Sequence, residues 1–263
     1  GTLFERLDQT GAGTGQYTLA IRGTAGGLDI FSADAFGIGT LGYARDQTYS
    51  LYNYFIRLIT PATENVGQWV NTGNTGLVDG ALVPLYEYQN NAAAGLGVIV
   101  DATGQNTNFG ALLNVAGHSL GGHLALAFSR LFPEWTSGVF TYNAPGIATS
   151  PAVDNFFSSF GGSGNYPGNL PQITTSVVGE AGRELISGFN GLPVPQRSVF
   201  IEDQGLPSAG NPAGNHSIKA LTDALAVYNL LGGLDTTLEL SQATPFLEAG
   251  SNKPNESLEA IVN

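Results

Sequence analysis

The chain has 263 residues, of which 42% are hydrophobic and only 11% are charged, and its formal net charge is −12. Its nine basic residues are scattered singly, which excludes the basic patch that nucleic acids and anionic membranes require. The absence of cysteine excludes disulfides, thiolate catalysis and metal sites built on sulfur. We expect residues 1–263 to form one domain, excised from or processed out of a longer chain.

The first part of the chain predicts one strand, one helix and two long irregular segments. Apolar side chains alternate along residues 16–21, which is typical of a strand. Residues 25–43 form a glycine-rich segment with apolar side chains that look exposed. Residues 44–60 carry aromatic and aliphatic side chains on one helical face, and Pro61 ends this helix. Residues 61–110 are rich in Gly, Asn, Ala and Thr, and we expect a long, partly structured insertion there.

The segment from Leu112 to Phe132 contains the pattern Gly117-His118-Ser119-Leu120-Gly121, which has the form Gly-x-Ser-x-Gly. An apolar run precedes the pattern and an apolar helical stripe follows it, so a strand, a tight turn and a helix are expected. In this setting the pattern indicates a nucleophile elbow, which holds a serine hydroxyl exposed at the top of a sheet. The glycines permit the sharp turn and the close packing of helix on strand. We therefore predict that Ser119 is a nucleophile.

The second half of the chain predicts three short strands, at residues 137–142, 173–179 and 197–202. Residues 147–171 are expected to form a Gly/Ser/Pro-rich loop. A helix is expected over residues 217–231, ended by Gly232-Gly233, and the tail from Ser241 is polar and acidic. Strands that alternate with helices predict an α/β fold with a mostly parallel central sheet and helices on both faces.

Three histidines are present, and they are not equally placed to act as the base for Ser119. His118 lies inside the turn, so we expect its side chain to point elsewhere. His123 lies on the following helix, where a packing or hydrogen-bonding role is expected. His216 follows the last predicted strand and begins the last large helix, which fits the chain order serine, acid, histidine of α/β-hydrolases. Elimination therefore selects His216 as the base.

The acid of a triad should lie between the serine and the histidine in the chain. We favour Glu180, because the strand over residues 173–179 ends there, at the sheet edge where α/β folds bind their ligands. Other acidic residues stay open as alternatives: Glu184, Asp203 and Asp154. The carboxylate would fix the tautomer of the imidazole and stabilise the imidazolium. The oxyanion would need two N–H donors, for which we predict Leu120 and, in the first strand–helix loop, Thr24.

Three motifs resemble the lipase class 3 (fungal-type) branch of the α/β-hydrolases, and bacterial secreted lipases and polyurethanase-like esterases in particular. They are AIRGT at 20–24, NVAGHSLGGHLA at 114–125 and TYNAPG at 141–146, and they occur in the order that the family shows. The Arg-Gly-Thr motif is the more specific of them, because the elbow pattern is shared by many hydrolases.

This resemblance implies an α/β-hydrolase fold, ester hydrolysis and an oxyanion hole at Thr24. It also implies a mobile apolar lid within residues 25–43. The chain departs from the family at the acid, where the family usually has Asp and this sequence offers Glu180 or Glu184.

We therefore expect a serine hydrolase that cleaves carboxylic esters, a lipase or lipase-like esterase that makes transient contact with a lipid interface. Acyl transfer to an acceptor other than water, thioester or amide cleavage, and a non-catalytic binding module are the alternatives. No cofactor is required, and loop acids are compatible with a structural calcium ion. No apolar run reaches about 18 residues, and the acidic, cysteine-free composition favours an exported bacterial enzyme. The sequence indicates no oligomeric state.

Overall fold

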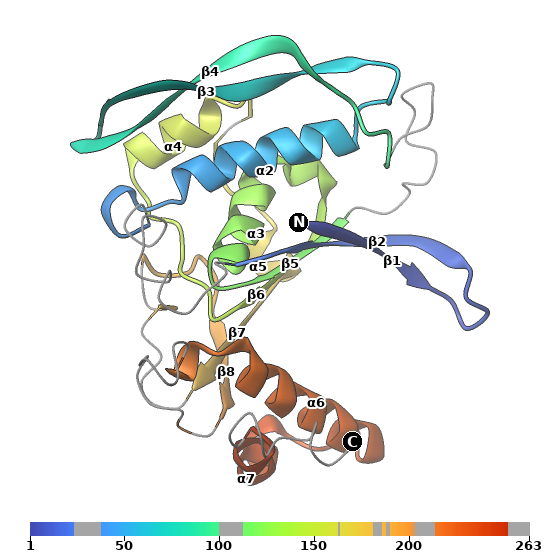
Figure 1. Ribbon diagram of the computed structural model, residues 1–263. Helices are drawn as coiled ribbons and strands as arrows, with labels where there is room; N and C mark the ends of the chain where they lie inside the picture. Colours follow the sequence, from blue (N-terminus) through green and yellow to red (C-terminus); the bar gives the residue numbers. More distant parts are fainter. Residues whose placement is uncertain are drawn as a thin grey trace.

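The computed structural model describes residues 1–23, 38–99, 113–162, 164–180, 186–187, 190–201, 203 and 214–251, with only the backbone of Glu180 (Figure 1). Its main feature is a six-stranded sheet of order β1-β2-β5-β6-β7-β8. The strands are β1 Thr2–Leu7, β2 Gly13–Ile21, β5 Leu113–His118, β6 Thr136–Tyr142, β7 Thr174–Glu180 and β8 Gln196–Phe200. Only β1 runs antiparallel to its neighbour, and the remaining pairs are parallel. The predicted mostly parallel sheet is confirmed.

Helices pack on both faces of this sheet (Figure 1). The longer ones are α2 Arg45–Leu58, α3 Leu120–Leu131, α4 Pro151–Ser158, α6 Ile218–Leu234 and α7 Leu240–Gly250, and the short ones are α5 Leu170–Ile173 and the 3₁₀ turns η2 Pro133–Trp135 and η3 Gly214–His216. In β6, Val139 packs against the α2–α3 side and Tyr142 packs against the α6–α7 side. Side chains three apart on a strand point to opposite faces, so the two helical layers lie on opposite sides.

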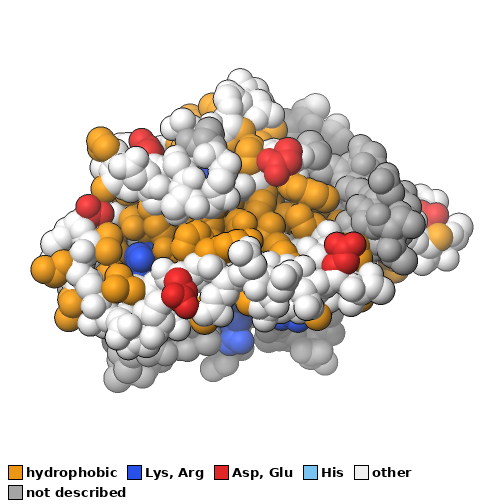
Figure 2. All heavy atoms as spheres, turned by 90° about the horizontal axis from the view of Figure 1, so that it is seen from above, with side chains coloured by type: hydrophobic (Ala, Val, Ile, Leu, Met, Phe, Trp, Pro, Cys, Tyr) orange, Lys and Arg blue, Asp and Glu red, His pale blue; other side chains and the backbone are white. Residues whose placement is uncertain are grey.

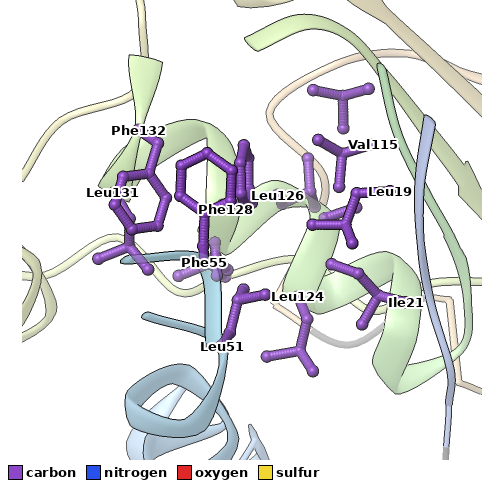
Figure 3. Packing of buried hydrophobic residues seen from close by; sticks show 14 of the residues in the cluster. Leu19, Ile21, Leu51, Phe55, Val115, Leu124, Leu126, Phe128, Leu131 and Phe132 are labelled. Atoms are coloured by element: carbon purple, nitrogen blue, oxygen red, sulfur yellow. The ribbon is translucent and has the colours of Figure 1, made fainter. Parts of the chain in front are cut away.

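The larger core lies between the sheet and the α2–α3 layer (Figure 3). Leu19 and Val115 point from neighbouring parallel strands toward α3, and both are fully buried. Phe128 of α3 meets Phe55 of α2 with ring centroids 4.7 Å apart in an edge-on arrangement. Burial of such side chains contributes about 1.5–3 kcal/mol each, which fixes α3 against the carboxyl end of β5. Among the described residues, no helix has both the length and the apolar character needed to cross a bilayer.

A long β-hairpin occupies most of the segment that we expected to be a partly structured insertion. Its strands, β3 Asn65–Val78 and β4 Ala81–Ala94, pair antiparallel and lie above α2 and α4 (Figure 1). Asp79 and Gly80 form the turn with φ of 49° and 81°, the two positive values that an Asp-Gly hairpin turn adopts. The two strands were not predicted from the sequence, because the glycine, asparagine and alanine residues within them have low strand propensity. Figure 2 shows the molecule from the side on which the hairpin lies in Figure 1. A central band of apolar side chains lies there between polar side chains, and few charged side chains are visible.

Four further elements differ from the sequence-based expectations. The edge strand β1 was not predicted, and α4 lies within the expected loop 147–171. Ser150 caps α4 by accepting from the Val153 N–H at 3.2 Å. Helix α6 continues through Gly232-Gly233, and the first part of the polar tail forms α7, which packs against α6 and against β8. Tertiary packing overrides weak local signals at these positions. Most of the predicted lid lies outside the described residues.

Candidate active site

Ser119 lies between the end of β5 and the start of α3 in a backbone conformation that only glycine adopts without strain. Its φ and ψ are 57° and −127°. The surrounding hydrogen bonds impose this conformation, because the Ser119 N–H donates to the Tyr142 carbonyl at 2.9 Å. The Ser119 carbonyl accepts from the N–H groups of Gly122 and His123 at 3.0 and 3.1 Å. Strain at a serine, held in place by its neighbours, is typical of functional sites.

The glycines of the motif are required because the turn leaves no room for a Cβ atom. A Cβ at Gly117 would collide with the backbone of Gly121, and one at Gly121 would collide with the carbonyl oxygen of Ile21. A Cβ at Gly122 would approach the Ala144 Cβ to 2.6 Å. These close approaches bring the ends of β2, β5 and β6 together around the first turn of α3.

The end of β2 runs directly beside the serine. A Cβ at Gly23 would lie 2.6 Å from the His118 carbonyl oxygen and 3.5 Å from the Ser119 Cβ. Leu120, on the other side of the serine, is the first residue of α3, where a backbone N–H has no acceptor within the helix. Thr24 follows Gly23 in the chain but lies outside the described residues. The geometry therefore places one predicted oxyanion donor, and the segment that leads to the other, against Ser119.

His216 is the last residue of η3 and is only 4% exposed. The η3 turn packs against β7, and the backbone carbonyl of His216 lies 2.9 Å from Nε2 of His118. The rings of these two histidines have centroids 4.8 Å apart. The fold thus brings His216 to the residue next to Ser119. The His118 side chain, expected to point away from Ser119, places its Nε2 at the carbonyl oxygen of His216.

Glu180 is the last residue of β7 and pairs in register with Phe200 of β8. Asn143 ties the end of β7 to the end of β6, since its side-chain oxygen accepts from the Gly179 N–H at 2.7 Å. Because β7 also contacts η3, the backbone of Glu180 lies on the strand that packs against this turn. The Glu180 side chain and all of Glu184 lie outside the described part of the chain.

The other two acidic candidates have different surroundings. Asp203 Oδ1 accepts from the side-chain amide of Asn215 at 2.8 Å, so this carboxylate sits next to the residue before His216. Asp154 instead forms an ion pair with Arg130 Nη2 at 2.8 Å. Arg130 is near the end of α3, about 16 Å along the helix from Ser119 at 1.5 Å per residue. Asp154 is therefore held at the far end of the helix and is not placed to orient His216.

His123 has a structural environment, as expected for a hydrogen-bonding histidine. It is fully buried, and its Nε2 accepts from the Ala44 N–H at 3.1 Å. With Nε2 as acceptor, Nδ1 carries the proton and donates to the Gly146 carbonyl at 3.1 Å. Burial lowers the pKa of His123 to about 4, and the two nearby backbone carbonyls of Pro145 and Gly146 oppose that shift only in part. The ring is thus neutral, and it links Ala44, just before α2, to the loop that follows β6.

The pKa of His123 gives the first testable prediction, on stability. Its folded value of about 4 lies below the ordinary 6.5, so the unfolded chain binds more protons between these values. The contribution of His123 to the free energy of unfolding is therefore complete above about pH 6.5 and declines as the pH falls. Near pH 4.5 the protein has lost about 2–3 kcal/mol of this contribution. We expect urea unfolding to show that His123→Gln, though less stable at pH 7, loses less free energy of unfolding on acidification than the wild type does. An equal loss in both proteins would contradict the assignment.

Sequence reasoning missed the contacts that join distant segments at this site. The pairs His118–His216 and Asp203–Asn215 are separated by 98 and 12 residues, and local periodicity carries no signal for either. Among the described residues, there is no group of three or more His, Asp or Glu side chains that could hold a metal ion. Comparison of the chain with family models, curated proteins and solved structures found no match.

Proposed function

We propose that the protein is a serine hydrolase with an α/β-hydrolase fold that cleaves carboxylic esters. The observation that carries this proposal is the conformation of Ser119, a non-glycine residue with φ of 57° between a parallel strand and a helix. This conformation costs of the order of 1–3 kcal/mol. It is the conformation that a nucleophile elbow uses to present a hydroxyl at the helix N-terminus.

The order of the strands supports the same proposal. The serine follows β5, one strand intervenes, the proposed acid Glu180 ends β7, and His216 follows β8. In parallel sheets the carboxyl ends of neighbouring strands lie at one edge, so three groups far apart in sequence can meet there. The chain order of serine, acid and histidine is that of α/β-hydrolases. The resemblance of three motifs to class 3 lipases points to the same chemistry.

In the proposed mechanism, His216 takes the proton of the Ser119 hydroxyl as the oxygen attacks the ester carbonyl carbon. The carbonyl oxygen becomes an oxyanion that accepts from the backbone N–H groups of Leu120 and Thr24. When the tetrahedral intermediate collapses, His216 gives its proton to the leaving alcohol, and an acyl-enzyme forms. A water molecule, deprotonated by His216, then attacks the acyl carbon and releases the acid and free serine. Glu180 keeps the imidazole in one tautomer throughout.

We further propose that the acyl esters come from lipids or lipid-like polymers and that the enzyme is exported. The proposal draws on the apolar composition of residues 25–43 and on the acidic, cysteine-free sequence. Transfer of the acyl group to an acceptor other than water would use the same residues, so the products distinguish the two reactions.

A fluorophosphonate probe tests the proposal directly, because it reacts with a serine only when a base and an oxyanion site activate it. We expect mass spectrometry of the native protein to locate one adduct, on the peptide that contains Ser119, and p-nitrophenyl butyrate and octanoate to be hydrolysed. The heat-denatured protein serves as the control and should not react. An unlabelled native protein that hydrolyses neither ester would refute the hydrolase and leave a binding module as the interpretation.

A further inference from the structure

A second histidine contacts the proposed base through its main chain. Nε2 of His118 lies 2.9 Å from the carbonyl oxygen of His216, and the two rings are 4.8 Å apart at an interplanar angle of 40°. A carbonyl oxygen only accepts hydrogen bonds, so the proton of a neutral His118 must be on Nε2. This tautomer is the opposite of the one that the contacts of His123 impose.

The two partners differ in how firmly the fold holds them. His118 is the last residue of β5, paired in register with Tyr142 of β6, and is therefore part of the central sheet. His216 belongs to η3, a turn of only three residues. A turn of this length makes too few internal hydrogen bonds to fix its own position, so contacts with other elements must do so. The bond from His118 is one such contact, and the bond between Asn215 and Asp203 is another.

We propose that His118 is a positioning residue that sets the distance between the nucleophile and the base. His118 and Ser119 are consecutive residues, so the serine and the anchor of His216 are fixed to the same strand end. A shift of the η3 turn would move the imidazole away from the hydroxyl without disturbing the elbow. This role deepens the proposed hydrolase function and rests on it, because it assumes that His216 is the base for Ser119.

Two substitutions separate a positioning role from a purely structural one. His118→Gln keeps an N–H donor at about the reach of Nε2, whereas His118→Phe keeps a ring but loses the donor. A misplaced catalytic group can cost up to about 100-fold in rate, so we expect His118→Phe to lower kcat for p-nitrophenyl butyrate by about 10- to 100-fold. KM should change by less than about threefold, since the lost bond acts on the position of the base. His118→Gln should recover most of the lost kcat.

The stability of both variants completes the comparison. We expect similar urea midpoints for His118→Gln and His118→Phe, because the lost bond positions a short turn and leaves the sheet intact. If kcat is the same in the two variants, or if the loss of kcat merely follows the loss of stability, the positioning role is refuted. Rates of fluorophosphonate labelling should follow kcat in the same order, since labelling needs the same base.

A measurement without substrate tests the geometry alone. The chain has three histidines, so ring ¹⁵N spectra can be assigned with single variants. We expect His118 to carry its proton on Nε2 and His123 on Nδ1. A His118 ring protonated on Nδ1 alone would overturn the positioning role even in an active enzyme. Absence of labelling and of turnover in the wild type would instead overturn the proposed hydrolase, and the positioning role of His118 with it.

Discussion

Replacement of Ser119 by alanine is expected to lower kcat/KM for p-nitrophenyl butyrate by at least about 10⁴-fold, because the attacking oxygen is removed. Backbone donors that stabilise an oxyanion would remain, so a residual rate slightly above that of water is expected. Ser129→Ala is the matched control. Ser129 lies in α3, the helix that follows Ser119, is fully buried and donates to the Leu126 carbonyl at 2.8 Å.

The Ser129 variant should lose some stability but keep its turnover, whereas the Ser119 variant should lose turnover and fluorophosphonate labelling together. A double variant of Ser119 and His216 should be no slower than either single variant, because the members of a triad act as a unit. Turnover that survives in Ser119→Ala, or additive losses in the double variant, would show that another group performs the chemistry.

Replacement of Glu180 by glutamine is expected to lower kcat by about 10³- to 10⁴-fold with little change in KM, since an amide no longer fixes the tautomer of His216 or balances the imidazolium. Asp203→Asn is the informative comparison. The Asp203 carboxylate accepts a hydrogen bond from the side chain of Asn215, the residue before His216. Loss of this bond should loosen the η3 turn and lower kcat by about tenfold. Glu134→Gln, in the η2 turn beyond α3, should have no effect on kcat.

The size of the kcat loss in each of these variants identifies the acidic member of the proposed triad. A large loss in Asp203→Asn with a small loss in Glu180→Gln would move the acid from the end of β7 to the segment after β8. A large loss confined to Glu184→Gln would place it four residues beyond the strand. In each case kcat should be measured at several pH values. A wrong tautomer lowers the maximal kcat of the pH–rate profile, whereas a changed environment of the base moves the pH at which kcat falls to half of its maximum.

The sequence alone was sufficient to predict those elements whose conformation depends on residues close together in the chain. The Gly-x-Ser-x-Gly segment is defined within about twenty residues, where an apolar strand, closely spaced glycines and an apolar helix follow one another. Steric exclusion of Cβ atoms at Gly117, Gly121 and Gly122 links that pattern to one backbone geometry. The parallel strands β5, β6, β7 and β8 were predicted for a similar reason, because buried strands carry continuous or alternating apolar side chains.

Only the tertiary structure decided which distant groups meet. The β3–β4 hairpin depends on pairing between two strands that glycine, asparagine and alanine interrupt, so local propensity identified neither strand. Its Asp79-Gly80 turn is a local signal of a hairpin. Asp154 was excluded as an acid by its ion pair with Arg130, a contact between α4 and α3. The contact of His118 with His216 joins residues that are 98 positions apart in the chain. Such contacts follow from sheet order and helix packing, which local periodicity does not encode.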